Sequence, residues 1–139
     1  MIVKFTVPGV PIGKGRPRIG RVGGNARMFT PAKTANYEGL IAHCAHVAMD
    51  GRPLILGAAF VGLLIVCQIP ASWSKKKQQQ AADGEIQPTV KPDTDNVVKA
   101  IFDGMNGVVW KDDVQNVSLM VNKKYGAVPG VHVAVKELA

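Results

Sequence analysis

The feature that most constrains the fold is an apolar run near the middle of the chain, PLILGAAFVGLLIVC at residues 53–67. A membrane-spanning helix needs about 20 apolar residues. This run is shorter, and Pro53, Gly57 and Gly62 interrupt it. A buried central strand over about residues 58–68 explains the run better, because such a strand is apolar on both faces.

The rest of the chain predicts helices and strands that surround this strand. Alternating apolar residues indicate strands, a Thr-Pro or Pro-Ala-Ser-Trp start indicates a helix, and Gly-rich stretches indicate loops. The predicted segments are a strand over 2–7, a Gly- and Arg-rich loop over 8–30, a helix over 31–49, a short helix from Pro70 to about Gly84, an extended connector over 85–91, an acidic helix, and strands over 116–125 and 131–137 that form a C-terminal hairpin. The order β-α-β-α-α-β-β predicts one α+β domain over residues 1–139, with helices packed on one mixed β-sheet in two layers.

The charge of the chain is unevenly distributed. Net charge is +7, and residues 1–33 alone contain seven Lys and Arg residues and no acidic residue. A basic balance of this kind favours an acidic partner such as nucleic acid. Two short basic segments could contact phosphates, Gly13-Lys14-Gly15-Arg16-Pro17-Arg18 and Ser74-Lys75-Lys76-Lys77, although both could also be solvated surface.

Half of the acidic residues lie in one segment, KPDTDNVVKAIFDGMNGVVWKDDV at residues 91–114. They are Asp93, Asp95, Asp103, Asp112 and Asp113. Mg²⁺ is bound through carboxylates, waters and substrate phosphates, and such an ion can activate water for attack on phosphorus. A dense acidic cluster in a basic protein therefore indicates a hard-cation site that faces a polyanion.

A purely structural interpretation of the same segment is also open. Val97, Ile101 and Met105 recur at helical spacing and form an apolar stripe. On such a surface helix, Asp93 or Asp95 would cap the first turn, and Asp95 would pair with Lys99 four residues later, for about 0.3 kcal/mol. Asp103, on the polar face of the same helix, could support Lys99 or a metal-bound water. DxD is a short motif that often occurs by chance, and it is the second acidic pair, after Trp110, that favours a functional site.

At this point a resemblance becomes specific. PDTDNVVKAIFDGMNG followed by VVWKDDVQNV resembles the RusA family of Holliday-junction resolvases, above all its phage-type members. The likeness extends over most of the chain, through GKGRPR and the PASWSKKK segment, and is strongest in the acidic region. One departure is Pro92, which stands where that family often has a basic residue.

The resemblance implies a role for each matching residue. Asp93, Asp95 and Asp113 correspond to the catalytic, metal-binding aspartates, and Lys99 to the lysine that assists them. Asn96 would hold a carboxylate of the site in place, and Asp112 would replace Asp113 if the register of the pair is shifted. The DNA-contacting residues implied are Lys14, Arg16 and Arg18. The basic run beside Trp73 adds Lys75, Lys76 and Lys77 as expected phosphate contacts.

The activity implied is Mg²⁺-dependent, structure-selective cleavage of four-way junctions, with Mn²⁺ as a substitute ion. A homodimer would make the paired cuts and leave 5′ phosphates, in recombination, repair or phage DNA processing. No membrane or small-molecule cofactor is expected. Two rivals are a non-catalytic basic DNA-binding protein of the same fold, and a small-molecule phosphotransferase that uses DxD, although such motifs usually follow a buried strand.

The cysteines and the N-terminus bear on the location of the protein. Cys44 and Cys67 are isolated, without the spacing of a metal or redox motif, and indicate thiols in a reducing compartment. Met1 leads directly into a predicted strand, so we expect no signal peptide. Together these features predict a cytoplasmic protein of a bacterium or a phage-infected cell.

Overall fold

The computed structural model describes residues 1–15, 18–22, 25–29 and 32–139, with residues 18–22 and 25–29 described as backbone only. Its centre is a four-stranded mixed sheet in the order β1-β6-β4-β5. The strands are β1 (Ile2–Pro8), β4 (Ala59–Gln68), β5 (Asn116–Gly126) and β6 (Gly130–Glu137). β4 pairs antiparallel with β6 and parallel with β5, so the apolar run does form a central strand, as predicted.

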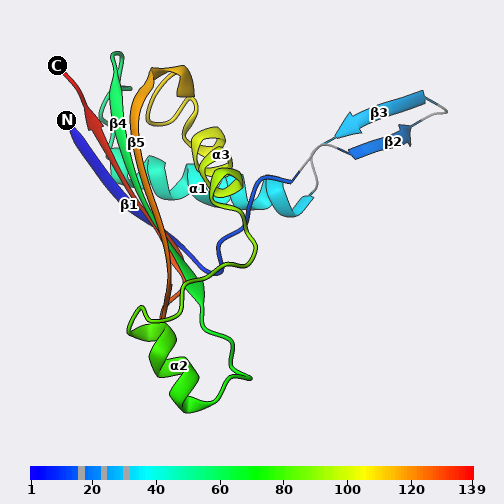
Figure 1. Cartoon of the computed structure of the whole chain (residues 1–139). Coiled ribbons are helices and arrows are strands. Elements are labelled where there is room, and N and C mark those ends of the chain that lie inside the picture. Colours follow the sequence, from blue (N-terminus) through cyan, green and yellow to red (C-terminus); the bar gives the residue numbers. More distant parts are fainter. Residues whose placement is uncertain (16–17, 23–24, 30–31) are drawn as a thin grey trace.

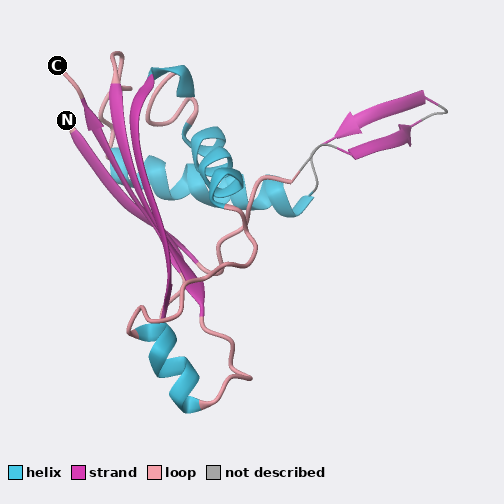
Figure 2. Cartoon of the chain, viewed as in Figure 1, coloured by secondary structure: helices cyan, strands magenta, loops and turns pink. Residues whose placement is uncertain are grey.

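Two helices cover one face of this sheet, α1 (Ala32–Met49) and α3 (Thr94–Met105) (Figure 1). The third helix, α2 (Lys75–Ala82), lies beyond one end of the sheet and apart from the other two (Figure 2). This arrangement confirms the predicted α+β class and the order of its elements. In the described ranges, no helix is both long and apolar enough to cross a membrane.

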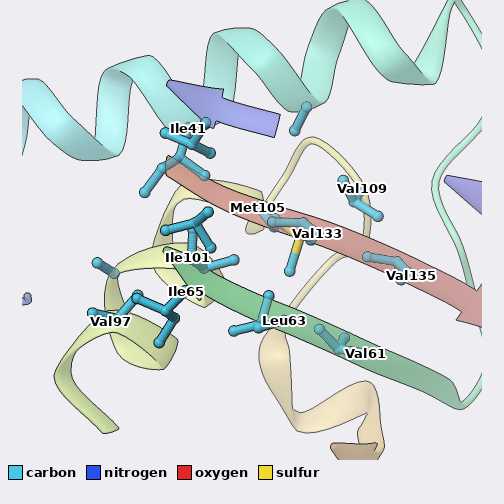
Figure 3. Close-up of a cluster of buried hydrophobic side chains, with 14 of the residues drawn as sticks. Ile41, Val61, Leu63, Ile65, Val97, Ile101, Met105, Val109, Val133 and Val135 are labelled. Atoms are coloured by element: carbon cyan, nitrogen blue, oxygen red, sulfur yellow. The ribbon is translucent and has the colours of Figure 1, made fainter. Parts of the chain in front are cut away.

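The core lies between the sheet and the two covering helices (Figure 3). Every second residue of β4 faces this layer, because side chains alternate along a strand. Ile41 of α1 and the apolar stripe of α3 pack onto them. The fully or almost fully buried residues of this layer include Ile41, Val61, Leu63, Ile65, Val97, Ile101, Met105, Val133 and Val135.

Two features of the strands differ from the predictions. The predicted loop over 8–30 contains an antiparallel strand pair, β2 (Arg18–Val22) and β3 (Asn25–Phe29). The predicted C-terminal hairpin is wrong, because β5 and β6 are not neighbours and β4 lies between them. Gly126 pairs with Gln68 and Gly130 with Val66, so the short connection 127–129 crosses the end of β4. The physical reason is that β4 is apolar along nearly its whole length and is stabilised by a strand on each side.

Candidate active site

The first acidic residues of the candidate site stand at the start of α3. Asp93 is the N-cap residue, yet its side chain makes no capping hydrogen bond, and Asp95 lies in the first turn. Both side chains are exposed. Within the described ranges, neither carboxylate is within 4.0 Å of a cationic group. Two carboxylates thus face solvent at the positive end of a helix, where negative charge is favoured.

Lys123 of β5 holds the segment that leads into this helix. Its ammonium donates to the carbonyl oxygens of Val90 and Pro92, the latter at 2.9 Å. Because Pro92 directly precedes Asp93, this contact ties the start of α3 to the edge strand of the sheet. The sequence offered no signal for this role, since Lys123 is one of two adjacent lysines on a predicted strand.

A buried tryptophan fixes the turn between α3 and the second acidic pair. Trp110 has no exposed surface, and its ring meets Phe102 edge to face at 5.2 Å between centroids. Its indole N–H donates to the Asn106 side-chain oxygen at 2.8 Å. Gly107 adopts φ 79°, a conformation that favours glycine. The turn is therefore fixed by its backbone conformation at Gly107 and by the burial of the Trp110 side chain.

The two adjacent aspartates after this turn do different things. Asp112 caps the short helix η1 (Asp113–Gln115), and its carboxylate accepts the Asp113 N–H at 2.8 Å. Gln115 completes the capping box by accepting the Asp112 N–H, and its amide donates to the carbonyl oxygens of Ile55 and Gly57. The Asp112 carboxylate is committed to the backbone, whereas the Asp113 carboxylate faces Lys99.

Lys99 connects the acidic helix to the second acidic pair. Its ammonium lies 3.1 Å from Asp103 Oδ1 and 3.6 Å from Asp113 Oδ2. Of the two aspartates four residues from Lys99, Asp103 forms the ion pair, and a pair with Asp95 is not found among the described ion pairs. The hydrogen bond to Asp103, above all, raises the pKa of Lys99 above its ordinary value of 10.5, and Lys99 is a cation at neutral pH.

Lys14 extends this charge network to α1. Its ammonium bonds Glu38 and lies 3.1 Å from Asp103 Oδ2. These contacts, led by the hydrogen bond to Glu38, raise the pKa of Lys14 above 10.5. Neither acidic partner was chosen from the sequence as a primary site residue. A signal did exist for Glu38, because it is the first acidic residue of a chain whose first 33 residues are strongly basic.

The backbone around Lys14 is fixed on both covering helices. The Lys14 N–H donates to the Asn96 carbonyl at 2.9 Å, and the Gly15 N–H donates to the buried Thr34 hydroxyl at 2.9 Å. A Cβ at Gly13 would lie 2.9 Å from the Asn96 Cβ, so only glycine fits there without displacing α3. Residues 13–15 are thus an ordered part of the site, and the interpretation as a solvated loop does not apply to them.

The other predicted DNA contacts lie elsewhere. Lys75, Lys76 and Lys77 are exposed on the first turn of α2, and the Lys77 ammonium lies 4.1 Å from the centroid of the Trp73 ring. Arg16 lies outside the described residues. Arg18 begins β2, where the structure describes the backbone alone.

The predicted metal ligands have the right chemistry for Mg²⁺, since all three offer carboxylate oxygens. In the part of the chain that the structure describes, however, no three His, Cys, Asp or Glu residues gather closely enough to hold a metal ion. The structure joins Asp113 to the acidic helix through Lys99. At the start of this helix, no ion pair among the described residues uses the carboxylates of Asp93 and Asp95. The assignment of Asp93, Asp95 and Asp113 to one metal therefore stays a prediction.

The parallel strands β4 and β5 are joined by a crossover that contains the aspartates of the candidate site. Residues 8–136 match the family model described as endodeoxyribonuclease RusA, and the chain belongs to that family of DNA-cleaving hydrolases. It is also 38% identical to a protein of Bacillus subtilis strain 168, YqaN, which is described as uncharacterized. That similarity covers 99% of this chain and 97% of YqaN.

Proposed function

We propose that this protein is a Mg²⁺-dependent endonuclease that resolves four-way Holliday junctions by paired phosphodiester hydrolysis. Membership of the endodeoxyribonuclease RusA family supports a junction-resolving nuclease in general. The observation that carries the proposal is the 3.6 Å contact between Lys99 and Asp113, because it joins the DxD helix and the second acidic pair into one site.

Asp93, Asp95 and Asp113 would hold the ion, with Mn²⁺ as a substitute, and Asn96 would restrain one of their carboxylates. When bound, a divalent ion supplies activation of water and stabilisation of the leaving oxygen. The capping bond from the Asp113 N–H engages one oxygen of Asp112, which supports Asp113 over Asp112 as the third ligand.

Lys99 would act as a fixed positive charge. Its ammonium lies against the carboxylates of Asp103 and Asp113, which favour the charged form, so Lys99 suits charge stabilisation better than the role of the base that takes a proton from water. A cation beside the reacting phosphate stabilises the negative charge that develops in the transition state. Loss of such a group in other enzymes costs about 10²–10³ in rate.

Basic residues outside the acidic region would bring DNA to the site. Exposed Lys75, Lys76 and Lys77 on α2 are suited to contact phosphates, and Arg16 and Arg18 would extend the basic surface. Contacts of this kind release counterions, so binding should weaken steeply as salt rises. They also offset the repulsion between exposed carboxylates and the DNA backbone.

A homodimer would match the substrate. A four-way junction is close to two-fold symmetric, and resolution needs two opposed cuts, which a C2 dimer presents from two equivalent sites. Recombination, repair or processing of replicated phage DNA would all supply such a junction. Sedimentation of the protein alone and with junction DNA would measure the assembly, and a monomer in both states would contradict the dimer.

The decisive experiment is cleavage of a synthetic four-way junction and of a linear duplex of equal length, with Mg²⁺ or with EDTA. We expect paired nicks in the junction that need Mg²⁺ and are lost in Asp95→Asn while binding persists. Asp50→Asn is a matched control, because Asp50 is exposed with φ 51° after α1 and asparagine tolerates that conformation. Tight binding without cleavage in Mg²⁺ or Mn²⁺ would leave a DNA-binding protein, and equal cutting of the duplex would remove the structure selectivity.

A further inference from the structure

Lys14 lies between two carboxylates that come from different helices. Glu38 belongs to α1 and Asp103 to α3, and the Lys14 ammonium contacts both. Only 23% of the Lys14 side chain is exposed, whereas the lysines of α2 are exposed to solvent. A phosphate that contacted Lys14 would compete with both ion pairs and would bring a third negative group close to Glu38 and Asp103.

Close packing of the helices explains why these two acids meet. A Cβ at Gly104 would lie 3.2 Å from the carbonyl oxygen of Glu38, so the backbones of α1 and α3 approach closely at this point. Asp103 precedes Gly104, and its carboxylate is therefore brought near that of Glu38. Lys14 neutralises a pair of charges that the packing itself creates.

Asp103 divides its two oxygens between two lysines. Oδ2 lies 3.1 Å from the Lys14 ammonium, and Oδ1 lies 3.1 Å from the Lys99 ammonium. More than half of the Lys99 side chain is exposed, at 56%, and a long exposed lysine otherwise samples many rotamers. Asp103 limits that freedom on one side, and Asp113 lies on the other.

We infer that Glu38, Lys14 and Asp103 are positioning residues that hold the Lys99 ammonium beside Asp113, and that Lys14 serves the active site and makes no contact with DNA. This inference rests on the proposed nuclease function and goes beyond it. It separates Lys14 from the other basic residues near the N-terminus. The chain Glu38–Lys14–Asp103–Lys99–Asp113 connects α1 to the second acidic pair through alternating charges.

The test combines two measurements on the full chain with junction DNA. The first is the single-turnover cleavage rate in Mg²⁺ at saturating enzyme, and the second is the slope of log binding constant against log salt in EDTA. For Lys14→Gln we expect the cleavage rate to fall about tenfold or more, since small displacements of catalytic groups are costly. The salt slope of this variant should equal that of the wild type. For Lys76→Gln we expect a slope shallower by about one, the change for one lost phosphate contact.

Further variants test whether a lower cleavage rate comes from a loss of folding or from the loss of any one positive charge. Lys14→Arg should recover most of the rate, because a guanidinium can bond both carboxylates. Asp103→Asn keeps the shape of the side chain and should also lower the rate at an unchanged slope. Lys136→Gln removes an exposed lysine of β6 and should change neither quantity.

A shallower slope in Lys14→Gln overturns the inference whatever happens to the rate, and so does a rate equal to that of the wild type. A wild-type protein that binds the junction without cutting it defeats the proposed nuclease instead. In that case the slope of Lys14→Gln still decides whether Lys14 contacts DNA.

Discussion

Gly104 of α3 packs directly against Ile41 of α1, so closely that a Cβ at residue 104 would lie 2.5 Å from the Ile41 Cγ2 atom. Both residues belong to the layer between the helices and the sheet. This contact sets the distance between the two helices that carry Glu38 and Asp103. The packing of the core and the charges of the site are therefore coupled at one glycine.

Substitution of this glycine should destabilise the protein. Gly104→Ala gains about 1 kcal/mol in helix propensity, yet forcing a methyl group into a packed core typically costs about 1–3 kcal/mol. We expect a net loss in the free energy of unfolding, measured by urea denaturation. Gly39→Ala in α1 is the control, because a Cβ there meets nothing within 4 Å, and it should stabilise by about 0.4–1 kcal/mol. A Gly104→Ala variant as stable as Gly39→Ala would contradict the close approach.

The adjacent aspartates should respond differently to the same substitution. Asp113→Asn removes the charge that faces Lys99 and should lower the cleavage rate by at least about 10²-fold. Asp112→Asn keeps an oxygen that can accept the Asp113 N–H as a cap, and should retain most of the activity. Junction cleavage rates in Mg²⁺ measure both. Equal losses in the two variants would show that the pair acts as a unit.

The three lysines of α2 should not be equivalent in DNA binding. Lys77 lies over the Trp73 ring, an interaction worth about 0.5–1 kcal/mol at an exposed site. Lys75→Gln and Lys76→Gln should each make the salt dependence of binding shallower by about one, whereas Lys77→Gln should also lower the free energy of unfolding. Salt titrations of junction binding and urea denaturation of each variant separate these effects. A loss of stability in Lys76→Gln equal to that in Lys77→Gln would remove the distinction.

Alkaline pH should weaken the charge network. The pKa values of Lys14 and Lys99 are raised on folding, chiefly by Glu38 and by Asp103 respectively. Their contribution to stability is therefore complete below 10.5 and is lost as pH rises through the raised values. We expect the difference in unfolding free energy between the wild type and Asp103→Asn to be constant from neutral pH to about 10 and to shrink above it. A difference that stays constant into that alkaline range would show that the ion pairs contribute little.

Local sequence patterns predicted the elements of the fold well. Period-2 alternation located the first strand and helical spacing located the acidic helix, because burial of one face imposes these periods. The central strand was located by its continuous apolar run, which reflects burial on both faces. The strand pair β2–β3 was missed, as the glycines and arginines of residues 8–30 indicated a loop. Gly23-Gly24 between two five-residue stretches was an available hairpin signal in the sequence.

The arrangement of the strands could not be predicted in the same way. A short connection at residues 127–129 indicates a hairpin, and nothing local shows that β4 inserts between its two strands. Pairing partners depend on contacts between distant segments, such as Leu63 with Val133 and with Val121. The position of β4 between β5 and β6 thus depends on contacts across the whole sheet.

In the candidate site too, residues close in sequence could be grouped in advance, whereas contacts between distant segments could not be predicted. The acidic segment stood out because its aspartates and Lys99 are close in sequence, and the structure brings Lys99, Asp103 and Asp113 together. The sequence could not decide between Asp95 and Asp103 as the partner of Lys99, since both are four residues from it and the presence of Lys14 beside Asp103 depends on tertiary packing. The separate roles of Asp112 and Asp113 likewise depend on Gln115 and on carbonyl groups about 60 residues earlier.

β5 lies at the edge of the sheet, and Asp113 stands immediately before it, in η1. An edge strand has one neighbour to hold it, and much of β5 is exposed, including Val117 and Met120. Partial opening from this edge would carry Asp113 away from Lys99 while the antiparallel pairing of β1, β6 and β4 persists. The proposed site would then lose its geometry at a lower cost in free energy than global unfolding requires. Amide protons of β5 should therefore exchange with solvent sooner than those of β4.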